Sequence, residues 1–270
     1  MQAPIRAALF VPATRPERFA KALAAGADTV IIDLEDAVEH PLKEQARNNL
    51  REFAAANPQA TILVRINDAT TSWFEEDLAL CSALPSVRAL VLPKAESPEQ
   101  VKRVADTGKP VLPIVESPRG VLALSGIAAV PGVERLSFGC LDMMLETRTI
   151  PDTAGAHILL DHIRCQILLC SAAHGLLPPV DGVYPNFADD QGLAAIASQV
   201  RDMGFGGMLC IHPRQIPVIL QAFAPSDADR EWAKRVVDTA DATGSLAFQL
   251  DGNMVDAPVI ERARRILASA

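Results

Sequence analysis

The chain has 270 residues, with 25 Lys and Arg against 33 Asp and Glu, so its formal net charge is −8. This length is ample for a large core, and a composition of 49% hydrophobic and 21% charged residues is typical of a globular protein rather than a disordered chain. The acidic total and the low aromatic content of 4% argue against a nucleic-acid binder.

Eight short apolar runs alternate with segments of helical periodicity up to about residue 215. The runs predict strands at 7–11, 29–34, 61–66, 89–92, 111–115, 135–138, 180–183 and 208–211. The segments between them predict helices at 16–25, 42–56, 73–84, 98–107, 121–129, 154–174 and 190–203. Gly26, Gly108, Gly175 and Gly204 stand where helix C-caps belong.

Strand–helix units repeated eight times predict an α/β fold of the (β/α)8 type, the TIM barrel. A doubly wound open sheet is the alternative, but no Gly-rich nucleotide loop follows an early strand. The tail does not continue the alternation, since it predicts two helices at 231–242 and 259–269 joined by a Gly-containing stretch. We therefore expect a barrel domain over 1–224 and a C-terminal helical lid or oligomerisation segment over 225–270.

Ionisable residues stand at the carboxyl ends of several predicted strands, where the chemistry of a TIM barrel is located. These residues are Asp33, Glu35, Asp36, Arg65, Lys94, Glu116, Asp142 and His212. Charges placed beside apolar sequence are costly unless a partner or a metal compensates them. We expect Glu35, Arg65, Glu116 and Asp142 to share one pocket at that face of the barrel.

Glu116 and Asp142 are the strongest metal-ligand candidates. No Cys or His ligand accompanies them, and an all-oxygen site favours a hard cation that keeps several waters, most plausibly Mg²⁺. The alternative is that Glu116 caps the segment after it and Asp142 starts a helix. Arg65 suits a substrate carboxylate, or else a structural ion pair with Asp33, Glu35 or Asp36. His212 is a ligand or base, or it hydrogen-bonds a loop before Pro213.

No run of residues approaches the roughly 18 apolar residues of a membrane span, and the N-terminus lacks the layout of a signal peptide. The five cysteines are scattered in apolar runs without the spacing of a zinc site. These features predict a cytoplasmic enzyme with reduced cysteines and neither a membrane nor a nucleic-acid partner.

Short motifs then occur in order along nearly the whole chain. They are Leu9-Phe10-Val11-Pro12, Asp33-Leu34-Glu35-Asp36-Ala37-Val38, Val64-Arg65-Ile66-Asn67, Leu92-Pro93-Lys94, Phe138-Gly139-Cys140-Leu141-Asp142, Ile211-His212-Pro213 and Met254-Val255-Asp256. With these motifs in register, the sequence resembles the citrate lyase β-subunit-like proteins of the HpcH/HpaI aldolase superfamily.

The resemblance implies a TIM barrel that makes or breaks a carbon–carbon bond in a β-hydroxyacyl thioester, usually of CoA. It implies Mg²⁺ on Glu116 and Asp142, Arg65 on the ketoacid carboxylate, and Lys21 facing the CoA phosphates. It also implies a homo-oligomer, a trimer or a hexamer, in which a C-terminal lid brings Asp256 to the neighbour's site. From the residues alone, Asp256 is equally an N-cap of the last helix ahead of Pro258.

The predicted activity is Mg²⁺-dependent cleavage of a malyl-CoA or citramalyl-CoA type of thioester to a ketoacid and an acyl-CoA. Arg65 and Asp256 are the predicted catalytic residues, and the predicted substrate-binding residues are Arg65, Glu116, Lys21, Glu35 and His212. Alternative functions are the β subunit of a citrate lyase complex acting on a carrier-bound citryl thioester, a malyl-CoA thioesterase, and a non-catalytic ligand-binding regulatory barrel.

Overall fold

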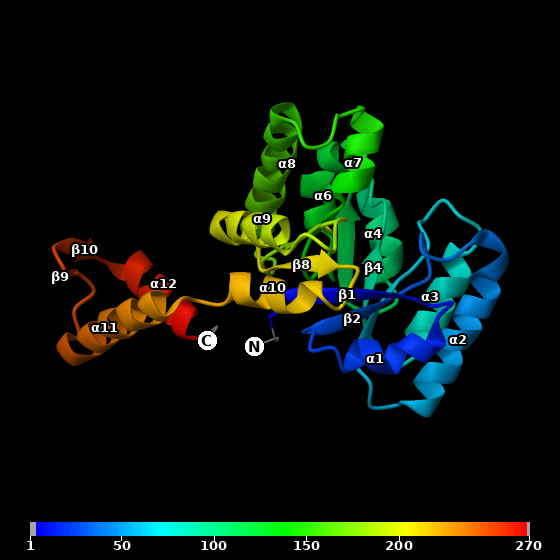
Figure 1. The fold of residues 1–270 in the computed structure, drawn as a ribbon, viewed down its shortest axis with the longest axis horizontal. Coiled ribbons are helices and arrows are strands. Elements are labelled where there is room, and N and C mark those ends of the chain that lie inside the picture. Colours follow the sequence, from blue (N-terminus) through cyan, green and yellow to red (C-terminus); the bar gives the residue numbers. More distant parts are fainter. Residues whose placement is uncertain (1–3, 269–270) are drawn as a thin grey trace. The chain divides into compact units, whose positions relative to one another are not determined.

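The computed structural model describes residues 4–268, which form two compact units that divide between Ala222 and Phe223. In the larger unit, eight parallel strands close into a barrel in chain order, and the last strand pairs with the first (Figure 1). The strands are β1 (Ala7–Pro12), β2 (Thr29–Asp33), β3 (Ile62–Arg65), β4 (Val87–Leu92), β5 (Val111–Val115), β6 (Ser137–Phe138), β7 (Val180–Asp181) and β8 (Gly207–Cys210). The predicted TIM barrel is confirmed, and an open sheet is excluded because no edge remains unpaired in these strands.

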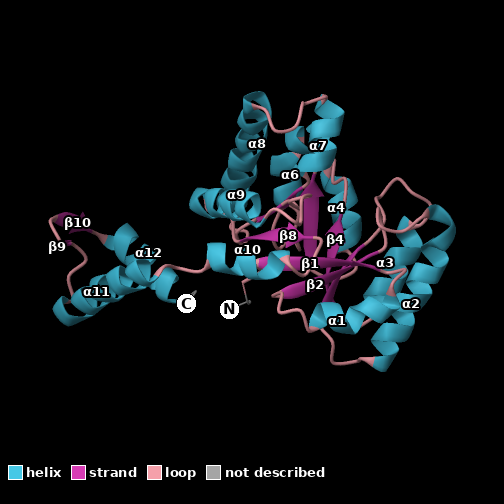
Figure 2. Cartoon of the chain, in the orientation of Figure 1, coloured by secondary structure: helices cyan, strands magenta, loops and turns pink. Residues whose placement is uncertain are grey.

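Helices connect the strands and lie around them (Figure 2). They are α1 (Phe19–Leu23), α2 (Lys43–Ala56), α3 (Phe74–Ala83), α4 (Pro98–Ala105), α5 (Pro118–Leu122), α6 (Leu124–Ala128), α7 (Cys140–Thr147), α8 (Ala154–Ala173), α9 (Asp190–Met203) and α10 (Gln215–Phe223), with short 3-10 turns η1 (Pro16–Arg18) and η2 (His40–Leu42). The four predicted capping glycines all have positive φ, as C-cap geometry requires. Within residues 4–268, no helix has the length and apolar character needed to cross a membrane.

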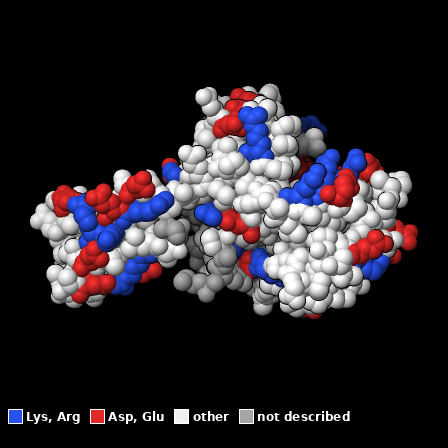
Figure 3. Space-filling view, turned by 60° about the horizontal axis from the view of Figure 1, so that its bottom comes forward, with Lys and Arg blue, Asp and Glu red and all other residues white. Residues whose placement is uncertain are grey.

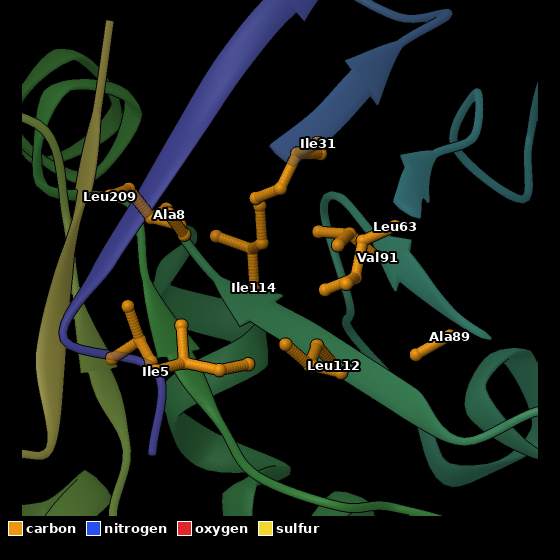
Figure 4. Packing of buried hydrophobic residues seen from close by; sticks show 10 residues of the cluster. Ile5, Ala8, Ile31, Leu63, Ala89, Val91, Leu112, Ile114 and Leu209 are labelled. Atoms are coloured by element: carbon orange, nitrogen blue, oxygen red, sulfur yellow. The ribbon is translucent and has the colours of Figure 1, made fainter. Parts of the chain in front are cut away.

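The interior of the barrel is a packed apolar core (Figure 4). Ile31, Leu63, Val91 and Ile114 lie on neighbouring strands, are at most 2% exposed and belong to one cluster. Full burial of such a side chain stabilises a fold by about 1.5–3 kcal/mol. Because side chains fill the centre, a ligand can reach the barrel only at its ends.

Gly207 permits the barrel to close. A Cβ at this position of β8 would overlap the backbone carbonyl oxygens of Ile5 and Arg6. Moving the two backbones apart to make room for it would break the pairing between β1 and β8. The absence of a side chain here is therefore a steric requirement rather than a matter of backbone flexibility.

Two helices of the larger unit were not predicted, and one predicted helix is divided. α7 begins directly after β6, and α10 follows the loop that contains His212. The helix predicted at 121–129 forms α5 and α6, which break at Ala123. It begins earlier than predicted because Ser117 accepts a hydrogen bond from the Gly120 N–H and caps the segment.

The smaller unit contains α11 (Asp227–Thr243), β9 (Phe248–Leu250), β10 (Asn253–Val255) and α12 (Ala257–Ala268), with its own apolar cluster between the helices. α11 begins earlier than the predicted residue 231, because Ser226 and Asp229 form a capping box. The antiparallel β9–β10 hairpin was not predicted. Its two-residue loop, Asp251-Gly252, has positive φ at both positions, which is the geometry that Asp-Gly favours in tight hairpins.

Candidate active site

A cavity of about 290 Å³ lies at the carboxyl ends of the barrel strands. It is lined by Phe10, Pro12, Asp33, Asp36, Ala37, Arg65, Ile114, Glu116, Phe138, Gly139, Cys140, Leu141, Asp142, Val183, Leu209 and Ile211. Three of the four residues expected to share one pocket, Arg65, Glu116 and Asp142, are among them. Glu35 is not; it is buried and forms an ion pair with Arg65.

Arg65 is fixed by a two-pronged ion pair at the end of β3. Its Nε and Nη2 donate to the two carboxylate oxygens of Asp33, at 2.7 and 2.6 Å, and Asp33 is 1% exposed. The remaining Nη1 lies 3.2 Å from Glu35 Oε2 and 3.7 Å from Asp36 Oδ2. Burial lowers the pKa of Arg65, but Asp33, Glu35 and Asp36 together outweigh burial and raise the pKa of the guanidinium above its usual value. The structural ion pair, one of the two alternatives for Arg65, is therefore present, and it holds the guanidinium at the cavity wall.

Glu35 is placed by two cations. Its Oε1 accepts a 2.6 Å hydrogen bond from Lys94 Nζ, and its Oε2 faces Arg65. Burial raises the pKa of Glu35, and the two cations counteract that effect. Glu35 thus supports the residues of the cavity instead of lining it.

Glu116 is a buried carboxylate, 4% exposed, directly after β5. Its Oε1 accepts a 2.6 Å hydrogen bond from the Lys94 backbone N–H, which points to Glu116 because Lys94 adopts a left-handed backbone with φ of 47°. Burial raises the pKa of Glu116 to about 8; the Lys94 N–H opposes this shift, whereas the negative charges of Asp142 and Glu35 add to it. A bound cation would stabilise the ionised form of a carboxyl group in this position.

Asp142 lies in the first turn of α7 and is only partly buried. Its carboxylate lines the cavity together with that of Glu116, and the two repel each other. Within residues 4–268, no group of three or more His, Cys, Asp or Glu side chains is placed to hold a metal ion. Mg²⁺ nevertheless commonly has two carboxylate ligands and several water ligands. A divalent cation between the two carboxylates would relieve their mutual repulsion. The donor set therefore fits Mg²⁺.

Gly139 makes room for Glu116. A Cβ on Gly139 would overlap Glu116 Cβ and Oε2, although the backbone of Gly139, at φ −109° and ψ 88°, is accessible to other residues. We expect Gly139→Ala to displace the Glu116 carboxylate and to destabilise the fold by about 1–3 kcal/mol through overpacking. Thermal denaturation and Mg²⁺ titration measure the two effects.

Gly155→Ala is the matched control for Gly139→Ala. Its added Cβ would meet only Thr153 Oγ1, at 3.9 Å, so it should leave both the stability and the Mg²⁺ affinity unimpaired. Unchanged Mg²⁺ affinity in Gly139→Ala would contradict the role of this close contact.

The structure does not bring Lys21 or His212 to the cavity. Lys21 is exposed in the last turn of α1. His212 is also exposed, stacks on Phe187 with ring centroids 4.8 Å apart, and accepts a hydrogen bond from the Arg214 N–H through Nδ1. Of the two roles considered for His212, the structure shows the hydrogen bond within its own loop.

Asp256 belongs to the smaller unit and precedes α12. Its Oδ1 accepts a 3.4 Å hydrogen bond from the Val259 N–H, so it caps that helix. Both of the roles considered for Asp256 remain compatible with this geometry, because a capping oxygen occupies only one side of the carboxylate.

Sequence reasoning found only part of the support for the site. Asp33 and Lys94 stand out in the sequence as ionisable residues at strand ends, but their supporting contacts to Arg65, Glu35 and Glu116 become visible only in the structure. Lys43 had no such signal, since it lies in α2. It is 5% exposed, and its Nζ donates to the carbonyl oxygens of Leu34 and Glu35, which holds the loop after β2 in place.

On the face shown in Figure 3, Lys and Arg side chains lie among Asp and Glu and form no continuous basic surface.

A model of the HpcH/HpaI aldolase/citrate lyase family matches residues 6–213. A citrate lyase subunit beta-like protein of Mycobacterium tuberculosis is 39% identical over 265 residues, which are 97% of this chain and 94% of that protein. A (3S)-malyl-CoA thioesterase of Cereibacter sphaeroides is 34% identical over 99% of this chain and 95% of its own length.

Solved structures agree with these relatives. The CitE protein of Mycobacterium tuberculosis, in complex with magnesium, acetoacetate and coenzyme A, superposes with a TM-score of 0.86 at 36% identity and covers 100% of this chain and 99% of its own. A citrate lyase beta subunit of the same organism, complexed with oxaloacetate and magnesium, has a TM-score of 0.75 at 37% identity and covers 83% of this chain and 98% of its own.

Proposed function

This chain belongs to the HpcH/HpaI aldolase/citrate lyase family, and on that premise we propose that it is a Mg²⁺-dependent carbon–carbon lyase of β-hydroxyacyl-CoA thioesters. The observation that carries the proposal is one cavity, at the carboxyl ends of the strands, which combines the Glu116 and Asp142 carboxylates with the Arg65 guanidinium. The magnesium, ketoacid and coenzyme A in the CitE complex support it.

Glu116 and Asp142 would hold Mg²⁺, which supplies Lewis acidity toward the hydroxyl and carboxylate oxygens of the substrate. The Lys94 N–H fixes Glu116 Oε1, so the carboxylate keeps one orientation. Arg65, itself held by Asp33, presents positive charge to the ketoacid half without having to reorganise during the reaction.

In the cleavage step the substrate hydroxyl gives its proton to solvent water as its carbon becomes the carbonyl carbon of the ketoacid, and the adjacent carbon–carbon bond breaks. The electron pair of that bond moves into the thioester enolate, whose carbon then takes up a proton. We assign delivery of this proton to Asp256, brought to the site by the C-terminal segment acting as a lid. The products are a ketoacid and an acyl-CoA.

Lys21, exposed on α1, faces the phosphates of CoA, and the chain assembles as a trimer or a hexamer in which one subunit's lid serves its neighbour. Besides its own copies, the proposed partners of the chain are the CoA-thioester substrate and the small ketoacid.

A second candidate is a thioesterase, which the (3S)-malyl-CoA thioesterase relative favours. The same cavity would then bind the thioester, and water would attack its carbonyl carbon. A thioesterase releases free CoA thiol and leaves the hydroxy acid intact, whereas a lyase releases a ketoacid and keeps CoA acylated. The two products identify the reaction.

The decisive experiment incubates the protein with malyl-CoA, citramalyl-CoA and citryl-CoA, with Mg²⁺ or with EDTA, and measures both ketoacid and free thiol. We expect ketoacid release with Mg²⁺ and none with EDTA. Free thiol without ketoacid supports the thioesterase. Neither product, together with no thermal stabilisation by Mg²⁺ and CoA esters, supports a regulatory barrel.

A further inference from the structure

The backbone of Lys94 has a conformation that lysine seldom adopts. Lys94 follows β4 and Pro93, and its φ of 47° lies in the left-handed region, which residues other than Gly, Asn and Asp rarely occupy. A strained backbone of this kind persists only where the surrounding structure holds it, and such residues cluster at functional sites.

Contacts on both sides of Lys94 hold this conformation. Its Nζ donates a 2.6 Å hydrogen bond to Glu35 Oε1 and lies 3.6 Å from Asp36 Oδ1. On the other side, the Ala95 N–H donates to the Ile114 carbonyl oxygen of β5 at 3.2 Å. The turn after β4 is therefore fixed between the loop after β2 and the neighbouring strand β5.

This backbone conformation directs one N–H group at Glu116. The Lys94 N–H donates to Glu116 Oε1 at 2.6 Å, so that oxygen already has a donor. The other oxygen, Oε2, lies against Gly139, where an added Cβ would overlap it. Gly139 immediately precedes α7, whose first turn carries Asp142. The oxygen of Glu116 that a cation shared with Asp142 would use is therefore Oε2.

We infer that Lys94 is a positioning residue of the metal site: its left-handed backbone, held by the ion pair with Glu35, orients the Glu116 carboxylate for Mg²⁺, although Lys94 supplies no ligand. The inference rests on the Mg²⁺ site of the proposed function. A residue that cannot hold this φ would turn its N–H away from Glu116 and free the carboxylate to rotate. Part of the binding free energy of Mg²⁺ would then be used to order the carboxylate again.

The charge of Lys94 and its backbone act on Mg²⁺ binding in opposite directions. Loss of a positive charge beside the acidic residues of the cavity favours a bound cation, so a variant that only removed charge would bind Mg²⁺ more tightly. Lys94→Gly, Lys94→Asn and Lys94→Val all remove the charge but differ in backbone preference. Gly and Asn adopt positive φ readily, whereas a β-branched residue such as Val does not.

The test measures the Mg²⁺ affinity of these three variants and of the wild type by calorimetry, together with their melting temperatures. We expect Lys94→Gly and Lys94→Asn each to bind Mg²⁺ at least about tenfold more tightly than Lys94→Val. Equal affinities in the three variants would overturn the inference and leave the metal site intact. Absence of Mg²⁺ binding in the wild type would overturn the metal site of the proposed function, and the inference with it.

Asp152→Val is the matched control for backbone strain. Asp152 also has a left-handed backbone, with φ of 58°, but it is exposed between α7 and α8 and is not among the residues that line the cavity. We expect Asp152→Val to lower the melting temperature without changing the Mg²⁺ affinity. A loss of affinity as large as that in Lys94→Val would assign the effect to general destabilisation and overturn the inference.

Lys94→Ala replaces Lys94→Val in the comparison if the latter does not fold. Ala differs from Gly by one methyl group, which is enough to disfavour positive φ. We expect Lys94→Ala to bind Mg²⁺ at least about threefold more weakly than Lys94→Gly. Equal affinities in this pair would overturn the inference.

Discussion

Replacing Glu116 with Gln is expected to lower the affinity for Mg²⁺ on the order of 100-fold and to abolish most of the ketoacid release. The substitution removes one of two anionic ligands but keeps an acceptor for the Lys94 N–H, so the side chain should stay in place. Calorimetric titration with Mg²⁺ measures the loss independently of activity.

The same variant should be no less stable than the wild type when metal is removed. Burial raises the pKa of Glu116 from its usual value near 4.5 to about 8, so the folded protein retains a proton that the unfolded chain has lost. The metal-free wild type therefore loses stability as the pH rises from about 4.5 toward 8, whereas Glu116→Gln lacks this contribution. Melting temperatures measured in EDTA across this range test the sign.

Two results would contradict this account of Glu116. Unchanged Mg²⁺ affinity in Glu116→Gln removes the carboxylate from the metal site. A pH dependence of the melting temperature identical to that of the wild type means that Glu116 does not retain its proton in the folded state. Asp142→Asn is the companion variant, since it tests the second ligand on a different element.

The barrel could be predicted because its signal is repeated. Each apolar run ends near a Gly or Pro or at a polar residue. Eight strand–helix units in succession are the number that closes a parallel barrel. The individual helices and strands were harder to predict where tertiary contacts determine their first and last residues. α7 starts in an apolar stretch that continues from β6, and β6 and β7 are only two residues long because pairing in the barrel, not local sequence, defines them.

Some of the missed elements had readable signals. Ser226 and Asp229 stand at capping-box spacing, and Asp251-Gly252 lies between residues that pair in a hairpin. Helical periodicity, on which the prediction for the tail rests, detects neither of these signals.

The candidate site was predictable only as far as its residues follow strands directly. Arg65 ends β3, Glu116 follows β5, and Asp142 lies in the first turn of α7 after β6; all three line one cavity. Glu35, in the loop after β2, does not line the cavity, and its carboxylate accepts a hydrogen bond from Lys94; this distinction depends on side-chain direction and not on position along the chain. The left-handed backbone of Lys94 and the close approach of Gly139 to Glu116 depend on packing between strands. No local pattern in the sequence indicates either feature.

The second large effect concerns Asp256. We expect Asp256→Asn to abolish most of the activity with little change in melting temperature, because Asn caps a helix about as well as Asp but cannot deliver a proton. Asp256→Ala is a poorer variant, since it also removes the hydrogen bond from the Val259 N–H and costs about 1 kcal/mol. Ketoacid release and thermal denaturation measure the two effects separately.

If the site is shared between subunits, two inactive variants should complement each other. Glu116→Gln is a better barrel-side partner than Arg65→Ala, because loss of Arg65 would leave Asp33 buried without its cation. In a ring where each tail serves the next barrel, random mixing of Glu116→Gln with Asp256→Asn gives about one quarter of the sites an intact Glu116 and an intact neighbouring Asp256. The mixture should therefore recover up to about a quarter of the wild-type activity. No recovery after verified subunit exchange would mean that Asp256 serves its own barrel, and full activity of Asp256→Asn alone would leave it only the capping role.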